Sequence, residues 1–147
     1  MTTSAQTAAE SAKLASHSLA SAAPETLNQA LLAIAAAIEG DSARILEANQ
    51  ADVAGALTMA SQGELSQATV DRLRLSPAKL KEMAASVRAI AALPGVIGKI
   101  LDQVELDTGL ELEKISCPLG VLAVIFEARP DAVTQISALA IKSGNAA

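Results

Sequence analysis

A continuous apolar run from Val121 to Phe126 limits the folds that are open to this chain. An apolar run of this length without polar alternation is typical of a strand buried on both faces, as in a parallel sheet covered by helices. The polar side chains Glu127, Arg129 and Asp131 follow the run directly. Ligands bind beyond the carboxyl ends of the strands in open α/β sheets, so these three residues form the candidate binding site.

The first 95 residues carry the spacing of amphipathic helices. Pro24 and Pro77 stand where a first-turn proline is favoured, and Gly40 and Pro94-Gly95 mark helix ends. Between these signals, apolar side chains recur three or four positions apart. We expect helices over about residues 4–23, 24–40 and 42–61, a short one through 70–73, and one over 77–93.

The period of the pattern changes after Gly95. Apolar residues then alternate on both sides of Asp107-Thr108-Gly109, which supplies a turn with a glycine able to adopt positive φ. This pattern predicts an antiparallel hairpin. A final helix after Asp131 is expected to end near Lys142-Ser143, with Gly144 as the residue beyond the cap.

Composition excludes several classes of protein. The chain of 147 residues is 51% hydrophobic and 18% charged, which is typical of one globular domain. Its net charge of −5, without any basic cluster, argues against a nucleic-acid partner. The longest apolar runs, 31–38 and 119–126, are far shorter than the roughly 20 residues of a membrane span. The absence of a signal-like N-terminus and the lone Cys117 indicate a cytoplasmic protein without an internal disulfide.

Five segments together resemble a known enzyme family. They are Asp71-Arg72-Leu73, the stretch from Met83 to Gly95, Pro118-Leu119-Gly120-Val121, Phe126-Glu127-Ala128-Arg129-Pro130-Asp131 and Lys142-Ser143-Gly144-Asn145. These segments are similar to gamma-glutamyl phosphate reductase, also called glutamate-5-semialdehyde dehydrogenase, of the aldehyde dehydrogenase superfamily. The likeness is greatest to the reductase half of the bifunctional pyrroline-5-carboxylate synthases.

The resemblance implies an α/β, aldehyde-dehydrogenase-like fold and an NADP cofactor. Residues 1–95 would form the helical region of the NADP-binding domain, 98–117 a β-hairpin usable in oligomerisation, and 118–147 the first strand-loop-helix unit of a parallel cofactor-binding sheet. The family continues into further strands and a catalytic domain with a nucleophilic Cys, so we expect this chain to be an N-terminal fragment. The whole enzyme would reduce gamma-glutamyl phosphate with NADPH in proline biosynthesis, as a homo-oligomer when full length.

Each candidate site residue also has a purely structural interpretation. Arg129 could bind a phosphate or carboxylate of the substrate or cofactor, or could form an ion pair with Glu127 or Asp131. Asp131 is most simply the N-cap of the last helix. The superfamily's oxyanion-binding amide could correspond to Arg129 or Asp131, but an ionised Asp would repel an oxyanion. Ala128 replaces the family's usual Ser, while Gly144 and Asn145 are expected to shape a turn.

Other reactive residue types are not expected to act. Cys117 lies far in the sequence from any plausible base, so it is expected to be an inert small hydrophobe, and no catalytic residue is assigned. His17 has no second metal ligand at helical spacing, and no metal site is predicted. Glu111 and Glu113 alternate with leucines as an exposed strand face would.

Two other functions are open on the sequence alone. The main alternative is a truncated pseudo-enzyme or a non-catalytic helical interaction module, which associates with a partner through the hairpin edge or the helical face. The module predicts a compact monomer or a defined complex with cooperative unfolding. The fragment interpretation predicts instead exposed apolar surface around Val121 to Phe126, because the chain encodes nothing to cover it. Another enzyme of the same superfamily is a weaker alternative.

Overall fold

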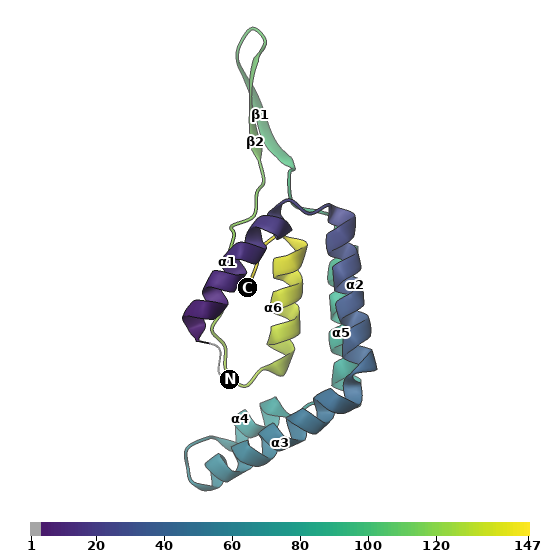
Figure 1. Ribbon diagram of the computed structural model, residues 1–147, viewed down its shortest axis with the longest axis vertical. Coiled ribbons are helices and arrows are strands. Elements are labelled where there is room, and N and C mark those ends of the chain that lie inside the picture. Colours follow the sequence, from purple (N-terminus) through teal and green to yellow (C-terminus); the bar gives the residue numbers. More distant parts are fainter. Residues whose placement is uncertain (1–3) are drawn as a thin grey trace.

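A computed structural model describes residues 4–147 and shows a group of helices from one end of which a hairpin projects (Figure 1). The elements are α1 (Ala5–Ala20), α2 (Pro24–Gly40), α3 (Ser42–Ser61), α4 (Gln67–Leu73), α5 (Pro77–Ala92), β1 (Ile100–Asp107), β2 (Leu110–Ile115) and α6 (Pro130–Lys142). None of the helices in residues 4–147 combines the length and the apolar character that crossing a membrane requires.

Local capping explains where several helices begin. The hydroxyls of Ser4, Ser66 and Ser76 accept hydrogen bonds from backbone amides in the first turns of α1, α4 and α5. Pro24 and Pro77 occupy the first turns of α2 and α5, as predicted, because their missing N–H groups would have no partner there.

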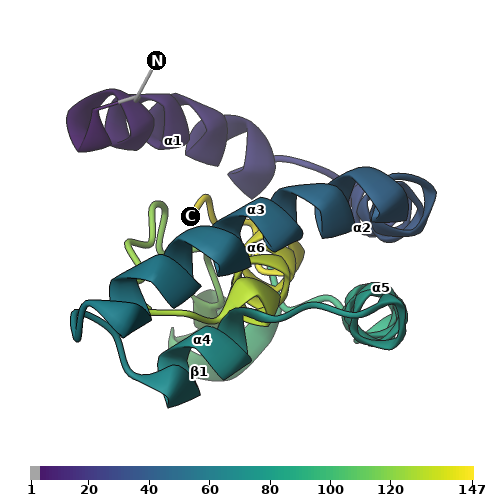
Figure 2. The ribbon, with the colours of Figure 1, turned by 90° about the horizontal axis from the view of Figure 1, so that it is seen from below.

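The main core lies where α2, α5 and α6 meet. Leu31, Leu80 and Val87 are at most 2% exposed, and the small side chains of Ala35 and other alanines fill the space between them. Figure 2 looks along α2 and α5 and shows them as neighbouring helices. Each buried Leu or Val side chain stabilises the fold by about 1.5–3 kcal/mol, whereas alanine contributes much less, so a few large residues carry this core.

Polar side chains join elements that are distant in the sequence. Asn49 of α3 donates to the carbonyl of Leu73 and accepts from the amide of Leu75, both at 2.8 Å. Arg88 of α5 binds both carboxylate oxygens of Glu39 on α2 at 2.7 Å. This hydrogen-bonded guanidinium lowers the pKa of Glu39 below its usual value. The Arg88–Glu39 pair is exposed, so it orients the two helices more than it stabilises them.

The predicted hairpin is confirmed. β1 and β2 pair antiparallel with Val104 opposite Leu112, and Gly109 adopts φ +75° in the turn. At the base of the hairpin, the amide of Ser116 donates to the carbonyl of Lys99 at 2.9 Å. All residues of both strands are exposed, and the hairpin extends away from the helices (Figure 1).

The prediction that residues 121–126 form a strand buried on both faces was wrong. Only Val121 makes a bridge, which is parallel and joins it to Ala146. The following residues have no strand partner among the described residues, and Ile125 is 100% exposed. A regular strand needs a continuous ladder of backbone hydrogen bonds with at least one neighbouring strand, and here the segment makes a single bridge at its start.

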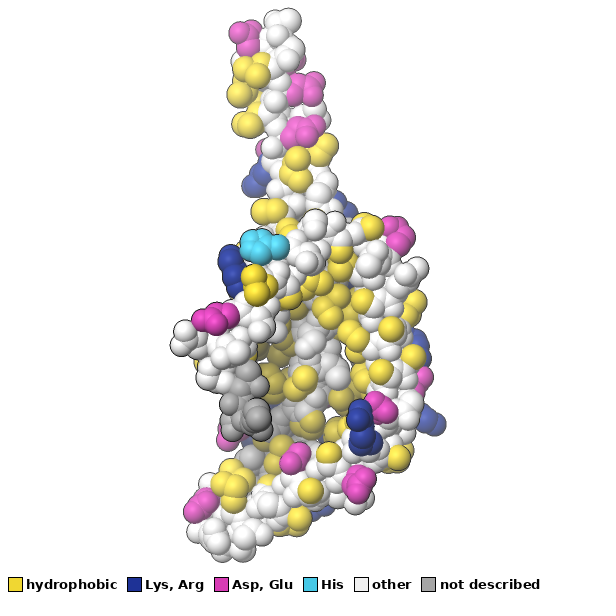
Figure 3. Space-filling model, in the orientation of Figure 1, with side chains coloured by type: hydrophobic (Ala, Val, Ile, Leu, Met, Phe, Trp, Pro, Cys, Tyr) yellow, Lys and Arg dark blue, Asp and Glu magenta, His cyan; other side chains and the backbone are white. Residues whose placement is uncertain are grey.

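The exposure of residues 119–126 bears on the fragment interpretation of the chain. Leu119 is 85% exposed and Phe126 is 45% exposed. The space-filling view shows further hydrophobic surface on the helices and along the hairpin (Figure 3). These exposures agree with the apolar surface that the fragment interpretation predicts around Val121 to Phe126.

A hydrophobic dye should detect this segment. We expect an Ile125→Ser/Phe126→Ser double variant to reduce the fluorescence of a bound apolar dye about twofold, because it removes a contiguous patch. The matched control is Leu14→Ser/Leu57→Ser, which removes isolated exposed leucines from α1 and α3. An equal decrease in the control would show that the dye does not report on residues 119–126.

Candidate functional site

A short backbone bridge fixes the start of the candidate site. The amide of Leu122 donates to the carbonyl of Ala146 at 2.8 Å, and the amide of Ala146 donates to the carbonyl of Gly120 at 2.9 Å. Residues 120–122, which precede α6 in the sequence, therefore pair in parallel with residue 146, which follows it, as at the beginning of a strand-helix-strand unit.

Gly144 and Asn145 form the turn that makes this bridge possible. Gly144 has φ +71° and follows the last turn of α6, where a residue without Cβ is favoured. The Asn145 Oδ1 atom accepts from the amide of Gly120 at 2.8 Å, and its Nδ2 donates to the hydroxyl of Ser143 at 2.9 Å. The turn-forming role predicted for both residues is confirmed, and Asn145 in addition ties the two ends of the unit together.

The site loop, residues 127–131, connects the exposed segment to α6. Ala128 adopts φ +51°, an uncommon value for a residue with a side chain. The N-cap of α6 is Arg129, not Asp131 as predicted, and Asp131 makes no capping hydrogen bond. Pro130 takes the first helical position because its ring presets φ, which moves Asp131 into the first turn. The carboxylate there still interacts favourably with the helix dipole.

The structure contains one of the two ion pairs that the sequence allowed for Arg129. Its guanidinium lies 3.6 Å from the Asp131 carboxylate, and the side chains are 60% and 38% exposed. Glu127 is exposed, and among the described residues it takes part in no ion pair. An exposed pair at this distance is weak, so Arg129 stays available to a ligand.

Two cations that the sequence did not suggest lie beside the site loop. Arg72 of α4 and Lys79 of α5 join Ala128, Arg129 and Asp131 around a hollow of about 310 Å³, here called the cationic hollow. Arg72 belongs to a segment that carried the family resemblance, but no spacing rule connects it to a residue 57 positions later. The tertiary arrangement brings them together, because α5 packs on α6 and α4 lies close to the start of α6 (Figures 1 and 2).

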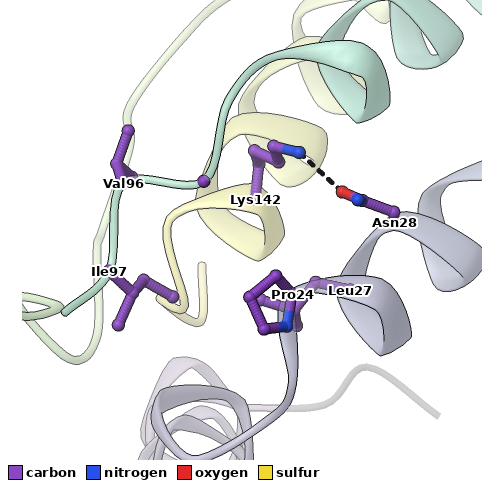
Figure 4. A pocket seen from close by; sticks show the side chains of 7 residues that line it. Pro24, Leu27, Asn28, Val96, Ile97 and Lys142 are labelled. Atoms are coloured by element: carbon purple, nitrogen blue, oxygen red, sulfur yellow. Dashed lines mark hydrogen bonds between the residues drawn. The ribbon is translucent and has the colours of Figure 1, made fainter. Parts of the chain in front are cut away.

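A buried lysine was also missed. Lys142 is 6% exposed, and its Nζ donates to Asn28 Oδ1 at 2.5 Å and to the carbonyl of Ala91 at 2.8 Å (Figure 4). It lies beside a small cavity of about 10 Å³ between α2 and the segment after α5. These contacts fasten the end of α6 to α2 and α5, so we assign Lys142 a structural role.

Other chemistry-bearing residues stay apart from the loop. Cys117 is exposed and not a packed hydrophobe, which corrects the prediction, because the segment it begins is itself uncovered. His17 lies in the last turn of α1, and Glu111 and Glu113 lie on the exposed hairpin. Within residues 4–147, no group of three or more His, Cys, Asp or Glu side chains could hold a metal ion.

Comparison with known proteins gives a consistent result. No protein-family model matches the chain. The gamma-glutamyl phosphate reductase of Natronomonas pharaonis is 46% identical over 146 residues, which are 99% of this chain and 33% of that protein. The enzyme of the same name from Acaryochloris marina is 48% identical over 145 residues, with the same two shares.

Solved structures agree with the sequence comparison. The crystal structure of gamma-glutamyl phosphate reductase from Saccharomyces cerevisiae matches with a TM-score of 0.85 and 34% identity, over 99% of this chain and 36% of that one. The structure from Thermotoga maritima matches with a TM-score of 0.85 and 29% identity, over 94% of this chain and 32% of that one. This chain spans about a third of the length of these relatives. In sequence and in fold it is similar to one third of a gamma-glutamyl phosphate reductase, which confirms the predicted resemblance and the predicted fold class.

Proposed function

We propose that this chain is part of a gamma-glutamyl phosphate reductase, which uses NADPH to convert gamma-glutamyl phosphate to glutamate-5-semialdehyde and phosphate in proline biosynthesis. The observation that carries the proposal is the 46% identity to such an enzyme over 99% of the chain. The strand-helix-strand beginning at Val121 and Ala146 supports it, because a parallel unit of this kind is where nucleotide cofactors bind.

Within that enzyme the chain would form part of the NADP-binding domain. Residues 1–95 would supply its helical layer, and 118–147 the first unit of its sheet. The hairpin, 98–117, has free strand edges and exposed apolar side chains, which suit pairing with another subunit in a homo-oligomer. We also place the enzyme in the cytoplasm, where a lone exposed thiol such as Cys117 stays reduced.

The site loop would contact substrate or cofactor. The available donors of Arg129 fit phosphate groups, which NADP carries, and when bound the nicotinamide supplies the hydride. Asp131, 3.6 Å away, would orient the Arg129 guanidinium, and Glu127 would border the cofactor channel. Cys117 is not the nucleophile in this proposal, because it lies far in the sequence from any plausible base.

A chimeric enzyme tests the proposal. This chain should replace the matching third of the Acaryochloris marina reductase, and the product should form NADPH from NADP, phosphate and glutamate-5-semialdehyde, the reverse of the proposed reaction. Absorbance of NADPH follows the rate. The parent enzyme serves as the control, and a folded chimera without turnover would refute the proposal.

The 147-residue chain should be assayed beside the chimera. We expect it to give no turnover and little affinity for NADPH, because the site loop offers few contacts to a dinucleotide. Measurable NADPH-dependent turnover by the chain alone would contradict the assignment of catalysis to residues outside it.

A further inference from the structure

The cationic hollow joins two consecutive helices to a loop about 50 residues later in the sequence. Arg72 comes from α4, Lys79 from α5, and Arg129 from the residue that caps α6. Figures 1 and 2 both place α4 close to the start of α6. The lining holds three cations and one carboxylate, a net charge of +2, on a chain whose overall net charge is −5. Three of the chain's 11 Lys and Arg residues therefore meet at one hollow.

Arg72 differs from the other arginines in lacking a carboxylate partner. Within 4.0 Å, Arg44 pairs with an Asp, Arg74 with an Asp and Arg88 with a Glu. Among the described residues Arg72 has no such partner, although Asp71 is its neighbour in the sequence and pairs instead with Arg74. A guanidinium that lines a hollow and has no carboxylate partner of its own is suited to bind an added anion.

The hydrogen bonds leave most donors of the hollow unused. Among the described residues, the Arg72 side chain donates once, to the Thr69 hydroxyl at 3.2 Å, out of five N–H groups. The ammonium of Lys79 donates once, to the carbonyl of Arg74 at 3.1 Å, out of three. Arg129 is only loosely paired with Asp131. The hollow is therefore rich in charged donors and poor in acceptors.

We propose that Arg72, Lys79 and Arg129 form a binding site for a phosphate group. A phosphate dianion offers several acceptor oxygens and two charges, which match converging guanidinium and ammonium groups better than a single carboxylate does. The identity of the ligand rests on the proposed function, in which both the acyl phosphate substrate and NADP carry such a group. Arg72 and Lys79 then select phosphorylated ligands, and the loosely paired Arg129 contributes a third cation.

Titration with inorganic phosphate tests the site without requiring catalysis. The 147-residue chain should bind phosphate, seen as shifts of amide resonances near Arg72, Lys79 and Arg129. Arg72→Gln and Lys79→Gln should each weaken binding about tenfold, since each removes a charge-assisted contact. The matched controls are Arg74→Gln and Lys81→Gln, each of which removes one positive charge two positions further along the chain. They should change the affinity for phosphate by less than about twofold. Equal weakening by the controls, or no phosphate binding, would overturn the proposal.

The chimera distinguishes the two sources of phosphate. If the hollow holds the substrate's phosphoryl group, Arg72→Gln should raise the KM for phosphate about tenfold and leave that for NADP unchanged. If it holds the 2′-phosphate of the cofactor, the KM for NADP should rise instead, and that for NAD, which lacks this group, should rise less. Unchanged KM values for phosphate, NADP and NAD would refute the proposed phosphate site. An inactive chimera with localised phosphate binding would refute the proposed function alone. Arg129→Gln, in an exposed loop, provides a second variant in case an α4 or α5 variant fails to fold.

Discussion

Replacement of Leu31 by alanine is expected to lower the free energy of unfolding by about 2–5 kcal/mol. Leu31 is 0% exposed and lies among Leu80, Val87 and several alanines between α2, α5 and α6. The loss combines the transfer free energy of the removed methyl groups with a cavity that the surrounding alanines cannot fill by moving. Urea denaturation followed by helical circular dichroism measures the effect.

The adjacent leucine provides the control. Leu32 is 48% exposed on the same helix, so Leu32→Ala changes the helix propensity in the same way but opens no cavity. We expect it to change the unfolding free energy by no more than about 0.5 kcal/mol. Similar losses for both variants would mean that α2 does not pack through the face that carries Leu31.

Gly144→Ala is expected to destabilise the chain by about 2–4 kcal/mol. The residue has φ +71°, and a Cβ there would lie 2.7 Å from Ile97 Cδ1 and 2.9 Å from Pro118 Cγ. The end of the isoleucine side chain can rotate away, but the proline ring cannot. The new methyl group should therefore push residue 118 away from the turn and weaken the bond between Gly120 and Asn145. Thermal or urea unfolding of the variant measures this cost.

A second glycine separates backbone strain from crowding. Gly63 has φ +79° but no atom within 4 Å of an added Cβ, so Gly63→Ala carries only the conformational cost, about 1–2 kcal/mol. The difference between the two variants isolates the contact with Ile97 and Pro118. In the chimera, Gly144→Ala should also reduce turnover, since the turn holds residues 120–122, from which the chain runs on to the site loop. Equal costs for the two glycines would show that the turn is not tightly packed.

The sequence predicted the parts of the fold that local chemistry determines. Pro24, Pro77 and Ser76 start helices where proline geometry and a capping hydroxyl are needed, and Asp107-Thr108-Gly109 turns a hairpin. The segment 121–126 was predicted to be a buried strand because its apolar run has that character. Strand formation depends on partner strands, and the described residues provide one bridge only.

The position of the candidate site could be predicted from the sequence, but the full set of residues that line it could not. Glu127, Arg129 and Asp131 follow the apolar segment as expected, and their roles in binding stay a prediction. The N-cap assignment of Asp131 was wrong because Pro130 takes the first helical position. Arg72 and Lys79 approach the loop only through the packing of α4 and α5, a tertiary arrangement that no spacing in the sequence encodes.

The hairpin has a consequence for how the molecule responds to stress. Its strands bury no side chain, and a two-stranded ribbon alone is at best marginally stable in water. The hairpin and the helical core are therefore expected to unfold almost independently, each with its own free energy of opening. The hairpin can therefore open and close many times while the helical core stays folded, so a change in the conformation of the hairpin costs the core little stability.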